Sequence, residues 1–167
     1  MSLILDNSQG RDGELWISNI TDLILPPLGQ DFVIVHQIEA VVSTLIFKEG
    51  EQCALMAVLN KDPSHRISHL HIPVTDRDED KDNISDYFEV VAHFIQEHRM
   101  RGKNVLVHCH AGKSRSVTFV TYYLLRLGIG MTVKEIIKMI KTKREVARPR
   151  KSFVKTLQKI EQQHFNS

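Results

Sequence analysis

Apolar residues recur along this chain with two periods, one typical of buried strands and one typical of amphipathic helices. Four short runs predict strands at 14–17, 40–47, 69–74 and 105–108, and the run at 40–47 is rich in β-branched residues. The last of these runs is uninterrupted, which is expected for a strand that is covered on both faces in a parallel sheet.

Apolar positions three and four residues apart predict helices between and after these strands. We expect helices over 51–59, 83–101, 117–127 and 133–140, another near 153–160, and a short one near 32–38 in the ambiguous stretch 21–37. Asn83 is a candidate N-cap, Thr132 and Glu135 have the form of a capping box, and Gly102 and Gly128 are stop signals. Strands that alternate with helices indicate an α/β fold, with helices on both faces of a mostly parallel sheet.

The length and composition predict one globular domain over residues 1–167, because 42% of the residues are hydrophobic and 25% are charged. The formal net charge of +2 does not indicate a nucleic-acid partner. One basic run stands out, since residues 138–151 hold seven Lys or Arg against Glu145 alone. A solvated helix face and loop is the favoured interpretation of this run, with a docking patch as the alternative.

Cysteine usage and the N-terminal residues bear on where the protein works. Only Cys53 and Cys109 occur, so we expect no disulfide framework and a reducing intracellular location, cytoplasmic or nuclear or both. Residues 1–11 lack the apolar centre of a signal peptide, no run is long enough to cross a bilayer, and Ser2 stands where myristoylation needs glycine. We therefore expect no membrane anchor.

The strongest candidate for chemistry is a nine-residue stretch between the strand at 105–108 and the apolar helix at 117–127. It reads His108-Cys109-His110-Ala111-Gly112-Lys113-Ser114-Arg115-Ser116. Backbone amides of a tight loop at a helix N-terminus attract anions, and the planar guanidinium of Arg115 matches a phosphate oxyanion. The stretch predicts a phosphate-binding cup with a cysteine nucleophile at its base.

Two other motifs compete for these residues. A nucleotide-binding P-loop needs a glycine at position 107, where the chain has Val107 inside a strand. A metal site would combine the histidines and the cysteine at 108–110 with His69 and His71, but no C-x-x-C or H-E-x-x-H partner is present. We therefore expect no metal and no other cofactor.

Residues 107–116 resemble the signature loop of the dual-specificity protein phosphatases, the compact branch of the cysteine-based protein tyrosine phosphatase superfamily. Further segments also resemble this family, at 15–19, 38–45, 72–76, 83–94 and 147–153. The resemblance implies the cysteine-phosphatase fold, with a mostly parallel twisted sheet of about five strands and helices on both faces. It also implies hydrolysis of phosphotyrosine and of phosphoserine or phosphothreonine in proteins, through a cysteinyl-phosphate.

Carried onto this chain, the resemblance assigns a role to each residue of the loop. Cys109 is the nucleophile. The phosphate oxygens are held by the Arg115 side chain and by the backbone amides of residues 110–115, which are His110, Ala111, Gly112, Lys113, Ser114 and Arg115 itself. Ser116 eases departure of the thiolate and His108 orients the loop, although a capping serine and a satisfied core histidine are equally open. We expect Lys113 to reach solvent or substrate without a catalytic role.

The leaving group needs a proton, and residues 76–82 offer five carboxylates in seven positions. The resemblance to the family points to Asp76 as the general acid when the two are aligned from Ile72-Pro73-Val74, and to Asp78 when they are aligned back from Tyr87-Phe88. We favour Asp76 because it is nearer the strand and better fixed. A merely solvated acidic loop is the alternative.

Two further functions stay open from the residues. The same chemistry on a phosphoinositide, an RNA 5′ end or a sugar phosphate is one, and a scaffold that binds phosphoproteins without cleaving them is the other. A phosphorylated protein is the partner we expect, with neither nucleic acid nor membrane, and the sequence indicates no particular oligomeric state.

Overall fold

The structure is a computed structural model, and it describes residues 1–7, 12–25, 27–77 and 83–165. Its strands are β1 (Ser2–Leu5), β2 (Leu15–Asn19), β3 (Ile38–Thr44), β4 (Ser68–Ile72) and β5 (Asn104–Cys109). Its helices are α1 (Ile20–Ile24), α2 (Leu28–Val35), α3 (Glu51–Leu59), α4 (Phe88–Met100), α5 (Arg115–Arg126), α6 (Val133–Lys143) and α7 (Lys151–Phe165), with a 3-10 turn at Ile84–Tyr87 before α4. Within these ranges, no helix is both long enough and apolar enough to span a bilayer.

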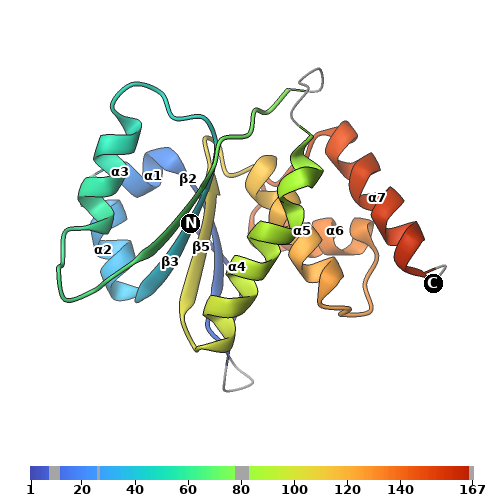
Figure 1. Ribbon diagram of the computed structural model, residues 1–167, viewed down its shortest axis with the longest axis horizontal. Coiled ribbons are helices and arrows are strands. Elements are labelled where there is room, and N and C mark those ends of the chain that lie inside the picture. Colours follow the sequence, from blue (N-terminus) through green and yellow to red (C-terminus); the bar gives the residue numbers. More distant parts are fainter. Residues whose placement is uncertain (8–11, 26, 78–82, 166–167) are drawn as a thin grey trace.

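The strands form one five-stranded sheet in the order β1-β2-β5-β3-β4. The β2–β5, β5–β3 and β3–β4 pairs are parallel, and only β1 runs antiparallel to its neighbour β2. Helices α1 to α3 lie on one side of the sheet and α4 to α7 on the other (Figure 1). The predicted α/β fold with helices on both faces is therefore confirmed.

The central strand β5 supplies side chains to two separate cores, because successive residues of a strand point to opposite faces. Val105 and Val107 belong to the larger core under α4 to α7. Leu106, between them, belongs to the smaller core under α1 to α3. All three are fully buried, which explains why the run at 105–108 carries no polar alternation.

Several elements depart from the predicted ones, among them β3, which covers Ile38–Thr44 instead of 40–47. The edge strand β1 was not predicted, because four residues are too few for an alternating pattern to stand out. The ambiguous stretch holds two helices, and α1 begins where the side chain of Asn19 accepts a hydrogen bond from the Asp22 amide. Strand β4 ends at Ile72 instead of Val74, since Pro73 has no amide hydrogen to donate to the ladder.

The predicted boundary signals act as expected. The Asn83 side chain accepts a hydrogen bond from the Ser85 amide, and Thr132 forms the capping box with Glu135. Gly128 adopts a φ of 64° just after α5. These local signals fix where α4, α5 and α6 lie along the chain.

The parallel arrangement brings four strand ends to one edge of the sheet. Asn19 at the end of β2 pairs with Cys109 at the end of β5, and Ser43 of β3 pairs with His108. Open α/β sheets bind ligands at the carboxyl ends of their strands. The sequence motif therefore lies where this kind of fold builds its sites.

Candidate active site

The nine-residue motif runs from the end of β5 through a tight loop into the first turn of α5, as the sequence predicts. Cys109 is the last residue of β5, and Arg115 is the first residue of α5. We call residues 109–115 the cup loop. The side chain of the N-cap, Ser114, makes no capping hydrogen bond, which leaves the first amides of α5 available to an anion.

The sulfur of Cys109 lies among hydrogen-bond donors of the cup loop and of the first turn of α5. The backbone N–H of Gly112 donates to Sγ at 3.2 Å, and the hydroxyl of Ser116 lies 3.3 Å from it. Burial alone raises the pKa of the Cys109 thiol, but the hydrogen bonds from Ser116, the charge of Arg115 and the Lys113 amide outweigh it. The net effect lowers the pKa, so the loop favours the thiolate, which is the nucleophilic form of cysteine.

Ser116 lies inside the first turn of α5 and is fully buried, so it is not the helix N-cap. Its described polar partner is the sulfur of Cys109. The alternative that Ser116 caps the helix is therefore wrong. A hydroxyl held against a thiolate stabilises the negative charge on sulfur.

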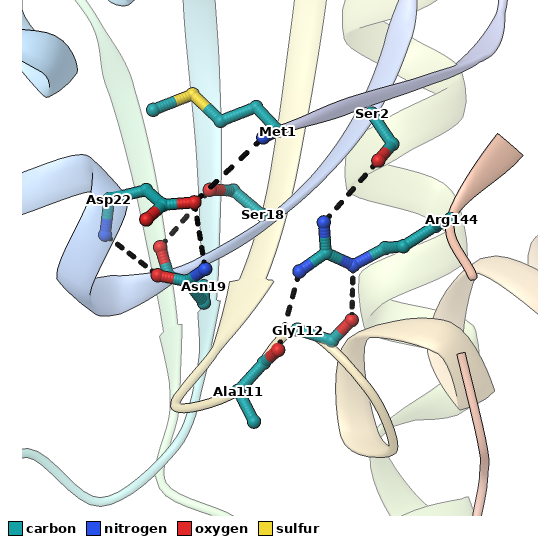
Figure 2. A network of polar contacts seen from close by, with 8 residues as sticks. All are labelled: Met1, Ser2, Ser18, Asn19, Asp22, Ala111, Gly112 and Arg144. Atoms are coloured by element: carbon teal, nitrogen blue, oxygen red, sulfur yellow. Dashed lines mark hydrogen bonds and ion pairs between the residues drawn. The ribbon is translucent and has the colours of Figure 1, made fainter. Parts of the chain in front are cut away.

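The peptide unit between Ala111 and Gly112 is held from both sides. Its N–H donates to the sulfur of Cys109, and its carbonyl accepts a hydrogen bond from Nη2 of Arg144 at 3.3 Å. Because the N–H and C=O of a trans peptide point in opposite directions, the bond to Arg144 turns the Gly112 N–H toward the thiolate. Figure 2 shows the Arg144 guanidinium against the Ala111 and Gly112 carbonyls and the Ser2 hydroxyl.

Gly112 is required by this geometry. Its φ is +60°, and a Cβ at this position would lie 2.4 Å from the carbonyl oxygen of Ser18 and 2.3 Å from Nη2 of Arg144. In the sequence, Arg144 stands out only as part of the basic run at 138–151. No local pattern reveals its role, because it contacts residues more than thirty positions away.

Arg115 is buried, with 5% of its surface exposed, and two of its three nitrogens have partners. Nη1 donates to the carbonyl of Val74 at 3.0 Å, and Nη2 lies 3.3 Å from Nδ1 of His110. Nε is buried and has no partner among the described residues. A buried N–H without a partner is costly, so this group is poised to bind an oxyanion.

His110 links the cup loop to α3. Its Nε2 lies 3.1 Å from Oε2 of Glu51, and its Nδ1 faces Arg115. If Nε2 carries the proton, it donates to Glu51 and leaves Nδ1 to accept from the guanidinium. No sequence pattern predicts this contact, because Glu51 lies 59 residues away from His110 along the chain.

His108 precedes Cys109 in β5 and is fully buried. Its Nε2 is 2.6 Å from the hydroxyl of Ser43, which lies 2.7 Å from Nε2 of His69, and its carbonyl accepts from Thr44 at 2.8 Å. Burial, reinforced by the nearby His69, lowers the pKa of His108 to about 3, so the imidazole is neutral. These contacts fit the predicted role of orienting the loop and the alternative of a core histidine alike.

Asp76 reaches the cup loop through Ser114. The Ser114 hydroxyl donates to Oδ1 of Asp76 at 2.8 Å, and Nε of Arg150 forms an ion pair with the same oxygen at 3.0 Å. The described partners of Asp76 are thus a hydroxyl and a guanidinium rather than other carboxylates. Asp78, the alternative acid, lies outside the described residues.

The remaining members of the cup loop differ in exposure. Gly112 and Ser114 are buried, His110 is partly buried, and Ala111 and Lys113 are exposed. Lys113 thus reaches solvent, as expected. Across the described part of the chain, no three His, Cys, Asp or Glu side chains cluster as a metal site would require.

The family model described as dual specificity phosphatase, catalytic domain, matches residues 28–163. Dual specificity protein phosphatase 1 of Arabidopsis thaliana is 39% identical over 99 residues, which are 59% of this chain and 50% of that protein. Human dual specificity protein phosphatase 15 is 38% identical over 94 residues, 56% of this chain and 31% of that protein.

The fold comparison agrees with the sequence comparison. The crystal structure of DUSP15 superposes with a TM-score of 0.71 at 29% sequence identity, covering 88% of this chain and 82% of that one. The chain spans about half or less of the length of these two curated relatives. The similarity to this family therefore extends over residues 28–163.

Proposed function

The chain belongs to the dual specificity phosphatase family, and on that premise we propose that it dephosphorylates tyrosine, serine and threonine side chains of proteins. One observation carries the proposal. A buried cysteine sulfur accepts a hydrogen bond from the Gly112 amide in a loop whose arginine keeps a buried N–H without a described partner. Sulfur and guanidinium supply a nucleophile and an oxyanion partner in one small space.

In the first step, the thiolate of Cys109 attacks the phosphorus atom, and the bond from phosphorus to the ester oxygen breaks. The Arg115 guanidinium and the amides of the cup loop hold the three equatorial oxygens as charge moves between them. Asp76 donates its proton to the departing oxygen. The position of Asp76 beside Ser114 supports this role, because Ser114 is the residue next to Arg115.

In the second step, a water molecule attacks the cysteinyl-phosphate and loses a proton to the Asp76 carboxylate. The bond from phosphorus to sulfur breaks, and Cys109 leaves as a thiolate. The Ser116 hydroxyl, 3.3 Å from the sulfur, stabilises that charge by donating a hydrogen bond. Inorganic phosphate is the product.

The partner proposed for this site is a phosphorylated protein, and no cofactor takes part. A net charge of +2 gives no support to a nucleic-acid partner. Both cysteines are free, which supports a reducing intracellular location. Two cores that share one sheet support the interpretation of residues 1–167 as a single catalytic domain.

The decisive experiment replaces the nucleophile and measures catalysis and binding separately. We expect Cys109→Ser to hydrolyse no p-nitrophenyl phosphate while still binding tungstate, which can be followed by calorimetry. Cys53→Ser is the matched control, because this exposed cysteine lies on α3, and it should keep both properties.

Two outcomes would contradict the proposal. Turnover that persists in Cys109→Ser would exclude a cysteinyl-phosphate. A wild-type protein that binds tungstate and phosphopeptides but releases no phosphate would favour the scaffold function.

A further inference from the structure

The phosphate-binding arginine of the cup loop is connected to a carboxylate on the other side of the sheet. Arg115 begins α5, whereas Glu51 begins α3, and these two helices cover opposite faces of the sheet (Figure 1). His110 lies between them, with Nε2 3.1 Å from Oε2 of Glu51 and Nδ1 3.3 Å from Nη2 of Arg115. A single imidazole therefore joins the two helical layers at the carboxyl edge of the sheet.

The two contacts of His110 are compatible with one tautomer of the imidazole. A guanidinium only donates hydrogen bonds, so Nδ1 accepts from Arg115 and carries no proton. The proton then lies on Nε2, which donates it to the carboxylate of Glu51. In the opposite tautomer an N–H would face the N–H groups of Arg115, and a lone pair would face the carboxylate. Glu51 therefore selects the tautomer in which His110 can accept from Arg115.

The carboxylate of Glu51 is held in place by the backbone at the start of α3. Its Oε2 accepts a hydrogen bond from the Lys48 amide at 2.8 Å, and the Glu51 amide donates to the Lys48 carbonyl at 3.1 Å. The side chain of Glu51 has 16% of its surface exposed, and that of His110 has 29%. Both side chains are thus mostly shielded from water, which strengthens the hydrogen bond between them.

The contact with His110 also fixes how the guanidinium of Arg115 is turned. Nη1 donates to the Val74 carbonyl at 3.0 Å, and His110 supplies a second point of attachment for the same plane. Nη2 carries two N–H groups and gives one of them to His110. The other remains for a phosphate, together with the buried Nε–H that has no partner among the described residues. A guanidinium held at two points is preorganised to bind an oxyanion.

We propose that Glu51 is a positioning residue for Arg115 and that it acts through His110. The proposal rests on the function proposed above, in which Arg115 holds the phosphate oxygens. Glu51 fixes the tautomer of His110, and His110 fixes the plane of the guanidinium. The residue that follows the nucleophile thus contributes through its side chain as well as through its backbone amide.

The test measures binding of tungstate by calorimetry, because this oxyanion reports on Arg115 without turnover. We expect Glu51→Ala to weaken tungstate binding by roughly tenfold, since the imidazole no longer presents a fixed acceptor to the charged guanidinium. The value of kcat/KM for p-nitrophenyl phosphate should fall by at least the same factor. Glu49→Ala is the matched control, because it removes the same charge from an exposed side chain two positions earlier, and it should change neither quantity.

Glu51→Gln separates selection of the tautomer from the effect of charge. The Lys48 amide needs an acceptor where Oε2 lies, so the oxygen of the glutamine amide is favoured at that position. That oxygen accepts from Nε2 of His110 as the carboxylate does. We expect Glu51→Gln to bind tungstate within about threefold of the wild type. A loss as large as that in Glu51→Ala would show that charge acts instead of the tautomer, and would overturn the proposal.

A double-variant cycle tests whether Glu51 acts through His110. In the background His110→Ala, Arg115 has already lost this contact, so adding Glu51→Ala should weaken tungstate binding no further. The unfolding temperature is the structural readout, because loss of the hydrogen bond to Lys48 should lower it in both backgrounds. Additive losses of tungstate affinity would contradict the proposed route, and so would a Glu51→Ala variant that binds tungstate as tightly as Glu49→Ala.

Failure of this proposal can be told apart from failure of the proposed function. A protein that bound tungstate with the expected differences among the variants, but released no phosphate from any phosphopeptide, would contradict the phosphatase function and support the role of Glu51. A protein that hydrolysed phosphopeptides, but bound tungstate equally well in wild type and Glu51→Ala, would contradict the role of Glu51 alone.

Discussion

Arg144 donates hydrogen bonds to the carbonyls of two successive cup-loop residues, from Nε to Gly112 and from Nη2 to Ala111 (Figure 2). Arg144 is itself buried, with 8% of its surface exposed. Carbonyl oxygens are negative, and any that turned into the cup would repel both a thiolate and a phosphate. By binding them on the outside, Arg144 keeps the amides of this loop directed inward.

Replacing Arg144 should therefore weaken catalysis through the nucleophile. We expect Arg144→Lys to raise the pKa of Cys109 and to lower kcat/KM by on the order of ten- to a hundredfold, because lysine keeps the charge but loses the two-pronged geometry. The pKa is measured from the pH dependence of iodoacetamide labelling at Cys109, with the exposed Cys53 as reference. If Arg144→Lys matched the wild type while Arg144→Met did not, charge alone would explain the effect.

Gly112→Ala tests whether the cup tolerates a side chain at its most crowded point. A positive φ costs an L-residue about 1–2 kcal/mol, and here the added Cβ would also collide with the Ser18 carbonyl at 2.4 Å. Gly128→Ala is the matched control, since its φ is +64° and nothing lies within 4 Å. We expect both variants to lower the unfolding temperature, and only Gly112→Ala to abolish turnover of p-nitrophenyl phosphate. Full activity in Gly112→Ala would contradict the geometry of the cup.

The buried imidazole of His108 predicts how stability depends on pH. Its pKa is about 3 in the folded protein and about 6.5 when unfolded, so between these values only the unfolded chain binds the proton. The free energy of unfolding should therefore fall as pH drops below 6.5, by about 2 kcal/mol at pH 5 from this group. Urea unfolding from pH 8 to pH 5 measures the slope. His108→Gln should flatten it, and parallel curves for the two proteins would contradict this assignment.

The elements and the candidate nucleophile are visible in the sequence because their signals are local. Cys109, Arg115 and Ser116 lie within eight consecutive positions, and the strand before them and the apolar helix after them fix how they meet. The residues that hydrogen-bond to the histidines on either side of Cys109 are instead distant in sequence. Ser43 is 65 positions from His108, and Glu51 is 59 from His110. Such contacts depend on strand order, which a single sequence does not encode as a visible pattern.

The strand boundaries illustrate the same limit on a smaller scale. Residues 69–74 contain the apolar pattern of a strand, but the ladder ends at Ile72, and the Val74 amide donates back to the Ile72 carbonyl at 2.9 Å. This turn releases the Val74 carbonyl to accept from Arg115 and directs the chain toward Asp76. The departure from regular structure thus occurs where the candidate acid is positioned.

Asp76 is the remaining assignment to test, and the choice of leaving group makes the test selective. A general acid contributes most when the leaving oxygen is strongly basic, because such an oxygen cannot depart as an anion. We expect Asp76→Asn to reduce kcat by roughly a hundredfold or more on an alkyl phosphate, and far less on p-nitrophenyl phosphate, whose phenolate departs readily. Asp78→Asn is the matched variant, because it removes the same charge two positions along the chain, and it should leave the ratio of the two rates unchanged. A ratio that changed in Asp78→Asn instead would transfer the acid to position 78. A ratio that changed in neither variant would show that the hydrogen bond from Ser114 and the ion pair with Arg150 only anchor the loop.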